Sequence, residues 1–243
     1  MELDRLLEKM ERHRVIRTLL SERPRENSLL LALAVTAGLA LTSALCWRDG
    51  SDWSLWLAAT TTGVFQHGEY WQLLTGQLVH ANLSHLLSNA LLFTFFGYLL
   101  YGYFGFRVFP LASFLLGGLV NYLSLLTYRP AAVRLVGASG MVYLMVGFWL
   151  TMYMLIERRL SVGRRIVHAI GVGLIVLMPT AFDQQVSYRT HAIGVAVGIS
   201  FALLYFALNQ QRIRAAEVSE PPELEDAPFD RVSEETWLNP DEF

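Results

Sequence analysis

Long apolar segments without Asp, Glu, Lys or Arg alternate with short charged clusters along most of the chain. A helix needs roughly 20 apolar residues to cross the hydrocarbon core of a bilayer. Six segments approach or reach this length: Ser28–Trp47, Leu86–Phe106, Val108–Thr127, Val136–Ile156, Ile166–Phe182 and Ala192–Leu208. The last two are the shortest, so we expect their helices to run a few residues further. The pattern predicts an all-α polytopic membrane protein with six transmembrane helices in one bundle.

The two ends of the chain differ from this apolar middle. Residues 1–27 are charged and carry apolar side chains at roughly helical spacing, which predicts a charged helix, cytoplasmic or lying on the membrane surface. Residues 210–243 combine many acidic residues with several prolines, and such a segment has too little apolar surface to fold alone. We therefore predict three regions: the N-terminal helix, a membrane domain over residues 28–209, and an acidic, disordered cytoplasmic tail.

The segment between the first two predicted spans is long and aromatic. It includes Trp53, Trp56, Phe65, Tyr70 and Trp71. Aromatic side chains of this kind favour the membrane–water interface. We expect a folded outer loop lying partly in the membrane surface; a disordered loop is the alternative.

Arginines indicate the orientation of the spans, since they are enriched in cytoplasmic flanks. With a cytoplasmic N-terminus the inner flanks hold eleven arginines and the outer loops hold four. The inner ones are Arg14, Arg17, Arg23, Arg25, Arg107, Arg158, Arg159, Arg164, Arg165, Arg212 and Arg214; the outer ones are Arg48, Arg129, Arg134 and Arg189. We expect both termini in the cytoplasm and, for a bacterial protein, a location in the inner membrane.

Composition supports a membrane protein and narrows the chemistry. Of the 243 residues, 53% are hydrophobic and 16% are charged, against about 25% charged residues in soluble domains. The single cysteine, Cys46, excludes a disulfide framework and a cysteine-based zinc site. The net charge of −2 gives no indication of nucleic-acid binding. We expect no cofactor and no metal.

Four polar residues in or beside the spans need a reason, because polar groups are costly in a membrane. His85 and Asn89 lie at the start of the second span, Ser139 at the outer end of the fourth, and His191 at the outer end of the sixth. With a cytoplasmic N-terminus, spans two, four and six all begin at the outer face. The topology therefore predicts that these residues lie at one shallow depth.

A serine beside a histidine suits nucleophilic catalysis. A serine hydroxyl is a weak nucleophile until a neighbouring base takes its proton, and neutral imidazole is a usual base. Attack on a peptide carbonyl creates an oxyanion, which needs positioned donors. The amide of Asn89, a ring nitrogen of His85 and the backbone N–H of Ser139 could supply them. His85 and Asn89 are four residues apart and so share a helix face.

Small residues surround this group of side chains. Gly194 and Gly198 lie on the helix face of His191, and Gly137 and Gly140 flank Ser139. Because small residues let membrane helices approach closely, spans four and six could bring Ser139 within reach of His191. Tyr143, four residues after Ser139, would stack beside that contact. Each residue alone has an ordinary explanation: a tolerated serine, an interfacial histidine, or an asparagine bonded to another helix.

Several strings over residues 28–208 resemble the rhomboid family of intramembrane serine proteases in order, spacing and placement. They are Gly68-Glu-Tyr-Trp-Gln-Leu-Leu-Thr75, His80, His85-Leu-Leu-Ser-Asn89, Gly97, Gly137-Ala-Ser-Gly-Met-Val-Tyr143 and His191-Ala-Ile-Gly-Val-Ala-Val-Gly198. The resemblance implies a six-helix bundle that cuts membrane proteins in or near their transmembrane helices. It also implies a serine–histidine dyad of Ser139 and His191 without an acidic third member.

The resemblance further implies an oxyanion site with His85 and Asn89, packing of Tyr143 against the base, and a structural role for His80. Two positions depart from the family pattern. Gln72 follows the loop tryptophan where the family often has arginine, and Tyr101 stands where it often has glutamate. Both positions look structural, so we expect them to affect the anchoring of the loop rather than the dyad.

Three other functions are less consistent with the sequence. A catalytically inactive relative that only binds membrane proteins typically lacks the serine or the histidine, and this chain has both. A transporter predicts charged residues within the spans, which are almost absent here. A metalloprotease would need a ligand set, but no His-Glu-x-x-His occurs and no carboxylate accompanies the histidines.

Overall fold

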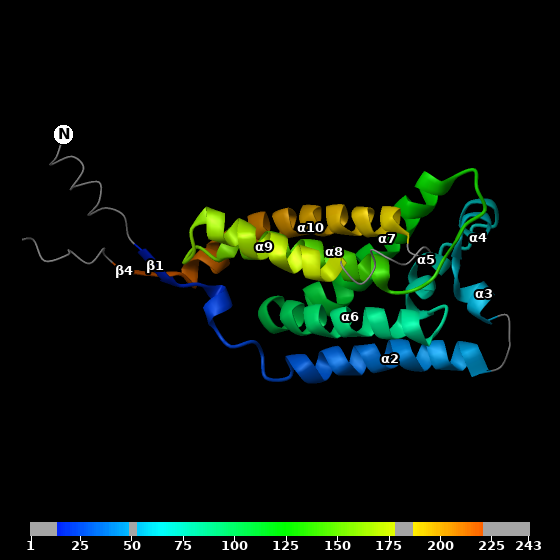
Figure 1. Cartoon of the computed structure of the whole chain (residues 1–243), viewed down its shortest axis with the longest axis horizontal. Helices are drawn as coiled ribbons and strands as arrows, with labels where there is room; N and C mark the ends of the chain where they lie inside the picture. Colours follow the sequence, from blue (N-terminus) through cyan, green and yellow to red (C-terminus); the bar gives the residue numbers. More distant parts are fainter. Residues whose placement is uncertain (1–13, 49–52, 178–186, 221–243) are drawn as a thin grey trace, which may run out of the picture.

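Long helices run side by side and form the body of the protein (Figure 1). The computed structural model describes residues 14–48, 53–177 and 187–220. The helices are α2 (Ser28–Arg48), α6 (Leu83–Phe104), α7 (Ser113–Tyr128), α8 (Ser139–Ile156), α9 (Val162–Leu177) and α10 (Tyr188–Ala215). A short segment with a kink at Phe109, η3 (Arg107–Ala112), leads directly into α7.

Five of these helical stretches are long and apolar enough to cross a membrane: α2, α6, η3 with α7, α8 and α10. The fold is thus a polytopic helical bundle, as the apolar segments predict. Within the described residues α9 is shorter, so a sixth span stays a prediction. The helix ends also differ from the predicted ends. The second helix begins at Leu83 because Asn82 caps it by accepting a hydrogen bond from the His85 N–H at 2.8 Å.

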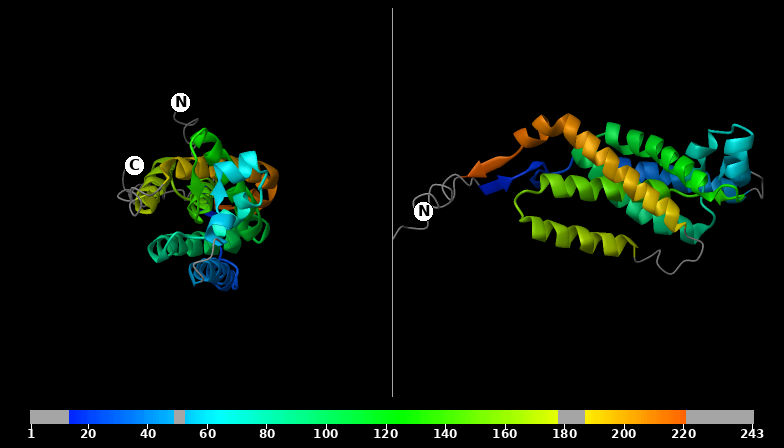
Figure 2. Two further views of the ribbon diagram at one scale, coloured as in Figure 1. Left: turned by 90° about the vertical axis from the view of Figure 1, so that its right-hand side faces the viewer. Right: turned by 90° about the horizontal axis from the view of Figure 1, so that it is seen from above.

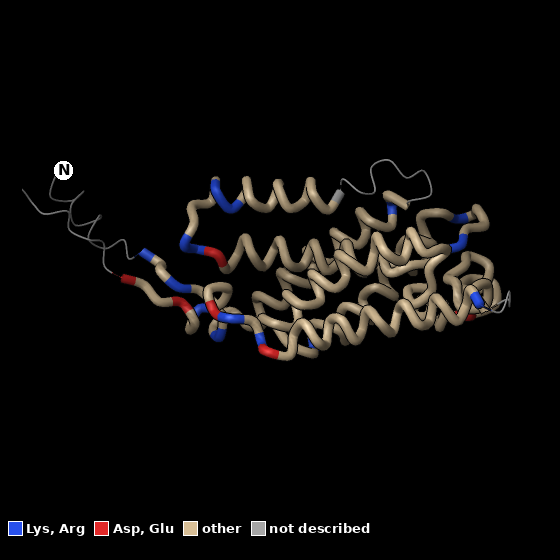
Figure 3. The backbone as a smooth tube through the Cα atoms, turned by 60° about the horizontal axis from the view of Figure 1, so that its bottom comes forward, with Lys and Arg blue, Asp and Glu red and all other residues tan. Residues whose placement is uncertain are grey.

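Helix α8 lies at the centre of the bundle. It packs against α6, α7, α9 and α10, and α2 packs on the far side of α6. A continuous run of its residues, Gly140–Phe148, is buried. The end-on view in Figure 2 shows α2 at the edge of the bundle. Acidic and basic residues gather at the two ends, whereas the middle of the tube in Figure 3 carries almost none.

The aromatic segment after α2 is folded into short elements at one end of the bundle. They are α3 (Trp53–Leu57), β2 (Ala59–Thr60), α4 (Thr61–Gln66), α5 (Gln72–Thr75) and η2 (Gly76–Leu78). Strand β2 pairs antiparallel with β3 (Arg134–Leu135), which joins this segment to the chain leading into α8. Its position in the membrane surface stays a prediction.

Gln72 holds this segment together by hydrogen bonds, although it departs from the family pattern. Its side chain is buried; Oε1 accepts from the N–H and the hydroxyl of Thr60 at 3.1 and 3.0 Å. Its Nε2 donates to the Trp56 carbonyl and to the Glu69 carboxylate at 3.3 and 2.7 Å. The amide therefore links three parts of the segment. Tyr101, the other departure, accepts a hydrogen bond from Asn27 at 3.2 Å.

The first and last described segments lie together at the opposite end of the bundle. Strand β1 (Arg14–Arg17) pairs antiparallel with β4 (Val218–Glu220). The predicted N-terminal helix is therefore wrong for its described part, where Arg14–Arg17 forms a strand with a distant partner and a short 3₁₀ turn, η1 (Leu19–Ser21), follows. The start of the predicted tail is folded, since α10 runs on to Ala215 and β4 follows. Residues 1–13 and 221–243 lie outside the described residues.

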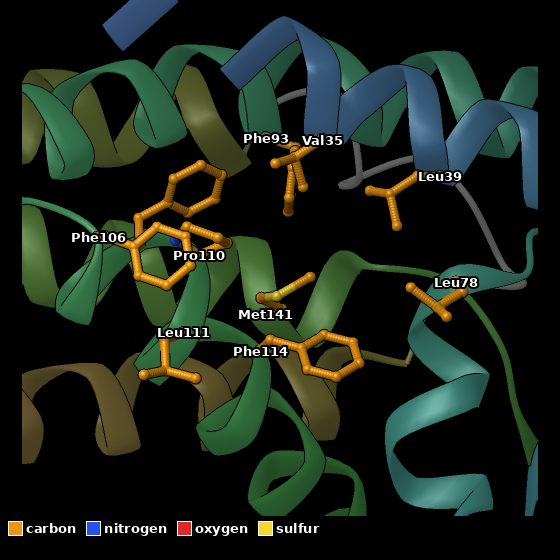
Figure 4. Close-up of a pocket in the computed structure, with 10 residues that line it drawn as sticks. Val35, Leu39, Leu78, Phe93, Phe106, Pro110, Leu111, Phe114 and Met141 are labelled. Atoms are coloured by element: carbon orange, nitrogen blue, oxygen red, sulfur yellow. The ribbon is translucent and has the colours of Figure 1, made fainter. Parts of the chain in front are cut away.

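An apolar cavity of about 300 Å³ lies between α2, α6, η3 and α8 (Figure 4). Val35, Leu39, Phe93, Phe109 and Met141 are among its lining residues, all of which are apolar. The Phe109 ring approaches α6 where Gly97 leaves room: a Cβ at Gly97 would lie 2.7 Å from the ring. An apolar cavity of this kind suits hydrocarbon rather than water.

Candidate active site

The starts of three helices surround a larger, polar cavity of about 480 Å³. Helix α6 contributes His85 and Asn89, α8 contributes Ser139, and α10 contributes His191; all four side chains line this cavity. These helix starts lie at the end of the bundle that also carries α3, α4 and α5 (Figure 1). The structure therefore brings together the four residues that the sequence placed at one depth.

Ser139 is the first residue of α8, and the backbone before it needs glycine. Gly137 has φ of +103°, in the region that strongly favours glycine. A Cβ at Gly137 would also lie 2.6 Å from Cε1 of His85. The first N–H groups of a helix have no acceptor within the helix and lie at the positive end of its dipole. Ser139 thus stands where backbone donors can stabilise a negative charge.

A buried hydrogen-bond chain holds the turn that precedes Ser139. The N–H of Ala138 donates to Nε2 of His80 at 3.2 Å, so the other ring nitrogen, Nδ1, carries the proton. That nitrogen lies 3.0 Å from the hydroxyl of Ser43, which donates onward to the Leu78 carbonyl at 3.2 Å. Burial, and secondly the neighbouring His85, lower the pKa of His80 to about 4. The ring therefore stays neutral and able to accept.

The His191 ring is held by stacking. It is 5% exposed, and its centroid lies 3.8 Å from that of Tyr143 with an interplanar angle of 13°. The Tyr143 hydroxyl in turn donates to the Val176 carbonyl of α9 at 3.4 Å. Nδ1 of His191 is buried without a hydrogen-bond partner among the described residues. Within that part of the chain, no carboxylate orients this histidine.

His85 and Asn89 lie one helical turn apart on the same wall of the cavity. The side-chain amide of Asn89 donates one hydrogen bond to the His85 carbonyl at 2.9 Å. A primary amide has two N–H donors, so this bond fixes the group and leaves a second donor. The His85 ring packs edge-on against His80, with centroids 5.3 Å apart. Both residues therefore present polar groups to the cavity that Ser139 also lines.

Glycines bring α10 into backbone contact with α8. A Cβ at Gly194 would lie 2.6 Å from the Gly140 carbonyl oxygen and 3.2 Å from Cβ of Tyr143. A Cβ at Gly198 would collide with the Leu144 carbonyl. A Cβ at Gly140 would lie 3.1 Å from the Thr190 methyl group. Close approach of the helices that carry Ser139 and His191 therefore depends on these small residues.

Some polar residues that were not predicted from the sequence also line the cavity. Asn121 of α7 donates to the Leu73 carbonyl at 2.9 Å, and Tyr128 shares a 2.6 Å hydrogen bond with Ser187, the N-cap of α10. Asn121 could have been noticed as a polar residue within an apolar segment. Arg134 of β3 also lines the cavity. No grouping of three potential metal ligands occurs within residues 14–48, 53–177 and 187–220.

Comparison with known proteins agrees with this architecture. Residues 67–208 match the family model described as a rhomboid domain, which is more than half of the chain. The chain is also 26% identical over 178 residues to a Bacillus subtilis (strain 168) protein named "Putative rhomboid protease YdcA", covering 70% of this chain and 81% of that protein. Taken with its apolar helices, these matches show that the chain is an integral membrane protein that belongs to the rhomboid family.

Proposed function

We propose that this protein is an intramembrane serine endopeptidase in which Ser139 is the nucleophile and His191 the general base. The observation that carries the proposal is the shared cavity. Ser139 and His191 line it from two helices in backbone contact, with the stacked Tyr143 beside them. Rhomboid membership implies intramembrane protease activity, and the name of the Bacillus relative agrees with it.

The reaction uses these residues in two half-reactions. His191 takes the hydroxyl proton as Ser139 Oγ attacks the peptide carbonyl, and it then gives that proton to the leaving amine. The result is an acyl ester on Ser139 and a released fragment with a new amino terminus. Water, activated by His191, hydrolyses the ester and restores the serine. A polar cavity of about 480 Å³ has room for this water.

The oxyanion of each tetrahedral intermediate needs donors that are already in place. We assign this role to the backbone N–H of Ser139 at the start of α8, the second amide proton of Asn89, and the ring of His85. A donor of this kind contributes about 10²–10³ in rate in a well-studied soluble protease. Three donors share the charge here, so removing the amide of Asn89 alone should reduce the cleavage rate by less than this factor.

The substrates proposed for this enzyme are membrane proteins, cut within or beside a transmembrane segment. The cavity lies at the end of the bundle where three helices begin, so a substrate must present its scissile bond near that membrane surface. We further propose that this is the outer surface of a bacterial inner membrane, because the arginine distribution favours a cytoplasmic location for both termini.

The test is activity-based labelling of the purified protein in detergent, together with cleavage of a model transmembrane substrate in vesicles. We expect a fluorophosphonate probe to label the wild-type protein and not Ser139→Ala, with substrate cleavage lost in parallel. Ser84→Ala, which removes another hydroxyl from the same cavity, is the matched control and should keep both activities. Cleavage by Ser139→Ala at the wild-type rate, or cleavage that a chelator abolishes and zinc restores, would contradict the proposal.

A further inference from the structure

One wall of the cavity is a continuous stretch of chain that ends at the nucleophile. Val133, Arg134, Leu135, Val136 and Gly137 all line the cavity, as does Ser139. Arg134 is exposed, and within the described residues its guanidinium has no hydrogen bond or ion pair. It therefore presents an unpaired positive charge to whatever enters the cavity.

The other arginines near this cavity are already engaged. Arg129 stacks on the Phe65 ring, with 4.9 Å from its Cζ to the ring centroid. Arg189 lies over the Tyr128 ring at 5.1 Å and donates to the Thr127 carbonyl at 3.2 Å. Neither is among the residues that line the cavity. Arg134 is thus the charged lining residue that the described part of the chain leaves without a partner.

No acidic side chain lines this cavity within the described residues. The nearest described acid on the neighbouring segment, Glu69, accepts a hydrogen bond from Gln72 at 2.7 Å. Nothing described in the cavity wall therefore neutralises the guanidinium, and a polypeptide bound at Ser139 would meet a positively charged wall.

We propose that Arg134 is a specificity residue that favours substrates with a carboxylate side chain close to the scissile bond. The inference rests on the proposed protease function. Arg134 lies five residues before Ser139, and an extended chain spans at most about 3.3–3.6 Å per residue. An extended substrate covers that separation in about five residues or fewer, so the acidic residue must lie within about five residues of the cleaved bond.

The size of the preference follows from the exposure of Arg134. An exposed ion pair of typical strength corresponds to about a 1.4- to fivefold difference in cleavage rate. Salt screens such pairs, so the preference should shrink as ionic strength rises. A peptide carboxylate is favoured over a lipid phosphate because Arg134 lies on the cavity wall that leads to Ser139.

The experiment compares model transmembrane substrates that differ at one position within five residues of the scissile bond, carrying Asp, Asn or Lys. Cleavage is measured with the full chain in phosphatidylcholine vesicles at low salt. We expect the wild-type enzyme to cut the Asp substrate about 1.4- to fivefold faster than the Asn substrate at one or two adjacent positions. Arg134→Gln should bring this ratio to one, and Arg134→Glu should favour Lys instead.

Arg129→Gln is the matched control, because it removes a nearby arginine that does not line the cavity, and it should keep the Asp preference. Equal rates for Asp and Asn at every position in the wild type, or a preference that survives Arg134→Gln, would overturn the inference. It is also overturned if Arg134→Gln matters only in vesicles that contain phosphatidylglycerol and regardless of substrate charge. That result would identify a lipid headgroup as the ligand.

A binding measurement separates this inference from the proposed function. Fluorescent Asp and Asn substrates are titrated against Ser139→Ala, with and without Arg134→Gln. Tighter binding of the Asp substrate that disappears with Arg134→Gln supports the inference even if the wild type cuts nothing, in which case the protease proposal alone fails. Equal binding of both substrates to Ser139→Ala overturns the inference whether or not the wild type is active.

Discussion

At the scale of single residues, the candidate base is oriented by an aromatic ring. In a serine–histidine–aspartate triad the carboxylate holds the histidine in one tautomer and orientation. Here Tyr143 stacks on His191, and Nδ1 of that histidine has no partner among the described residues. The orientation of the base should therefore depend on the ring of Tyr143 rather than on a charge.

A pair of substitutions at Tyr143 separates its ring from its hydroxyl. Tyr143→Phe keeps the stacking and loses the hydrogen bond to Val176, which is worth only about 0.5–1.5 kcal/mol to stability. Because the base keeps its orientation, probe labelling should stay within about twofold of wild type. Tyr143→Leu removes the stacking, worth about 0.5–1.5 kcal/mol, and labelling should slow by about two- to tenfold. The labelling rate of Ser139 is the measurement, with thermal unfolding as a check on the fold. Equal rates in the two variants would mean that the ring does not orient the base.

Protonation of His80, which holds the turn before Ser139, should make the stability of the fold depend on pH. Its pKa is about 4 in the folded protein, against 6.5 for the ordinary side chain. Between these values the unfolded chain binds a proton that the folded chain does not, so the free energy of unfolding falls as pH drops from about 6.5 to about 4. The full loss is about 3 kcal/mol at 1.36 kcal/mol per pKa unit, and nothing is lost above pH 6.5.

The measurement is the midpoint of thermal unfolding across that pH range. His80→Gln, whose amide can still accept from Ala138, should show a smaller decline towards low pH than the wild type. His67→Gln, which changes an exposed histidine of the same outer segment, should follow the wild-type curve. If His80→Gln declined as steeply as the wild type, the His80 ring would not be the source of this pH dependence.

At the scale of elements, the contact between α8 and α10 is a backbone contact. Gly198→Ala would place a methyl group against the Leu144 carbonyl, and overpacking of this kind typically costs 1–3 kcal/mol. We expect a lower unfolding temperature and slower cleavage, because the shift of α10 also moves His191. A change confined to stability, with cleavage at the wild-type rate, would mean that this contact does not position the site.

Gly171 provides the matched control for that substitution. It lies in α9, and no described atom would lie within 4 Å of an added Cβ. Gly171→Ala should therefore be neutral, or stabilising by up to about 1 kcal/mol from helix propensity. Comparing the two variants separates a general effect of losing glycine from an effect of the α8–α10 contact.

The elements that the sequence predicted well are those that hydrophobic length defines. The apolar stretches became helices because a bilayer demands internal hydrogen bonding over about 30 Å. Their ends were harder to predict, since Asn82 and Ser187 cap α6 and α10 through local bonds outside the apolar runs. Strand β1 could not be predicted from its own residues, because its partner β4 lies about 200 residues away in the chain.

The candidate site was predictable for a related reason. Helices two, four and six begin at one end of an up-and-down bundle, so spacing alone placed His85, Ser139 and His191 together. The hydrogen bond from Ala138 to His80 was not predictable in this way. It depends on the turn at Gly137 and on the fold of the aromatic segment, which tertiary contacts decide.

At the scale of the whole molecule, pairing of the chain ends constrains the topology. Strands β1 and β4 form one sheet, so the segments that carry them lie on the same side of the membrane. The chain must therefore cross an even number of times between them. The five long helices among the described residues give an odd number, so we predict that α9 belongs to a sixth crossing. Its described length is about 24 Å at 1.5 Å per residue for 16 residues.

Contacts at the two ends of α9 agree with a crossing. The turn before it lies beside the chain ends, since Arg158 pairs with Glu217 at 3.1 Å. The next described helix, α10, begins with Tyr188 at the cavity end of the bundle, while α9 begins at the end that carries β1 and β4 (Figure 2). The chain therefore has to return to the cavity end between the start of α9 and the start of α10.

Single cysteines in a Cys46→Ser background test this topology. Membrane-impermeant maleimide is added to intact cells and to inverted membrane vesicles. We expect cysteines at Ser161 and Ser219 to react only in the vesicles, because both lie at the end that carries the paired termini. Cysteines at Ala132 and Tyr188, at the cavity end, should react in intact cells. If the cysteines at Ser161 and Tyr188 reacted from the same side, α9 would not cross the membrane. The two chain ends would then need another crossing to meet in the β1–β4 sheet.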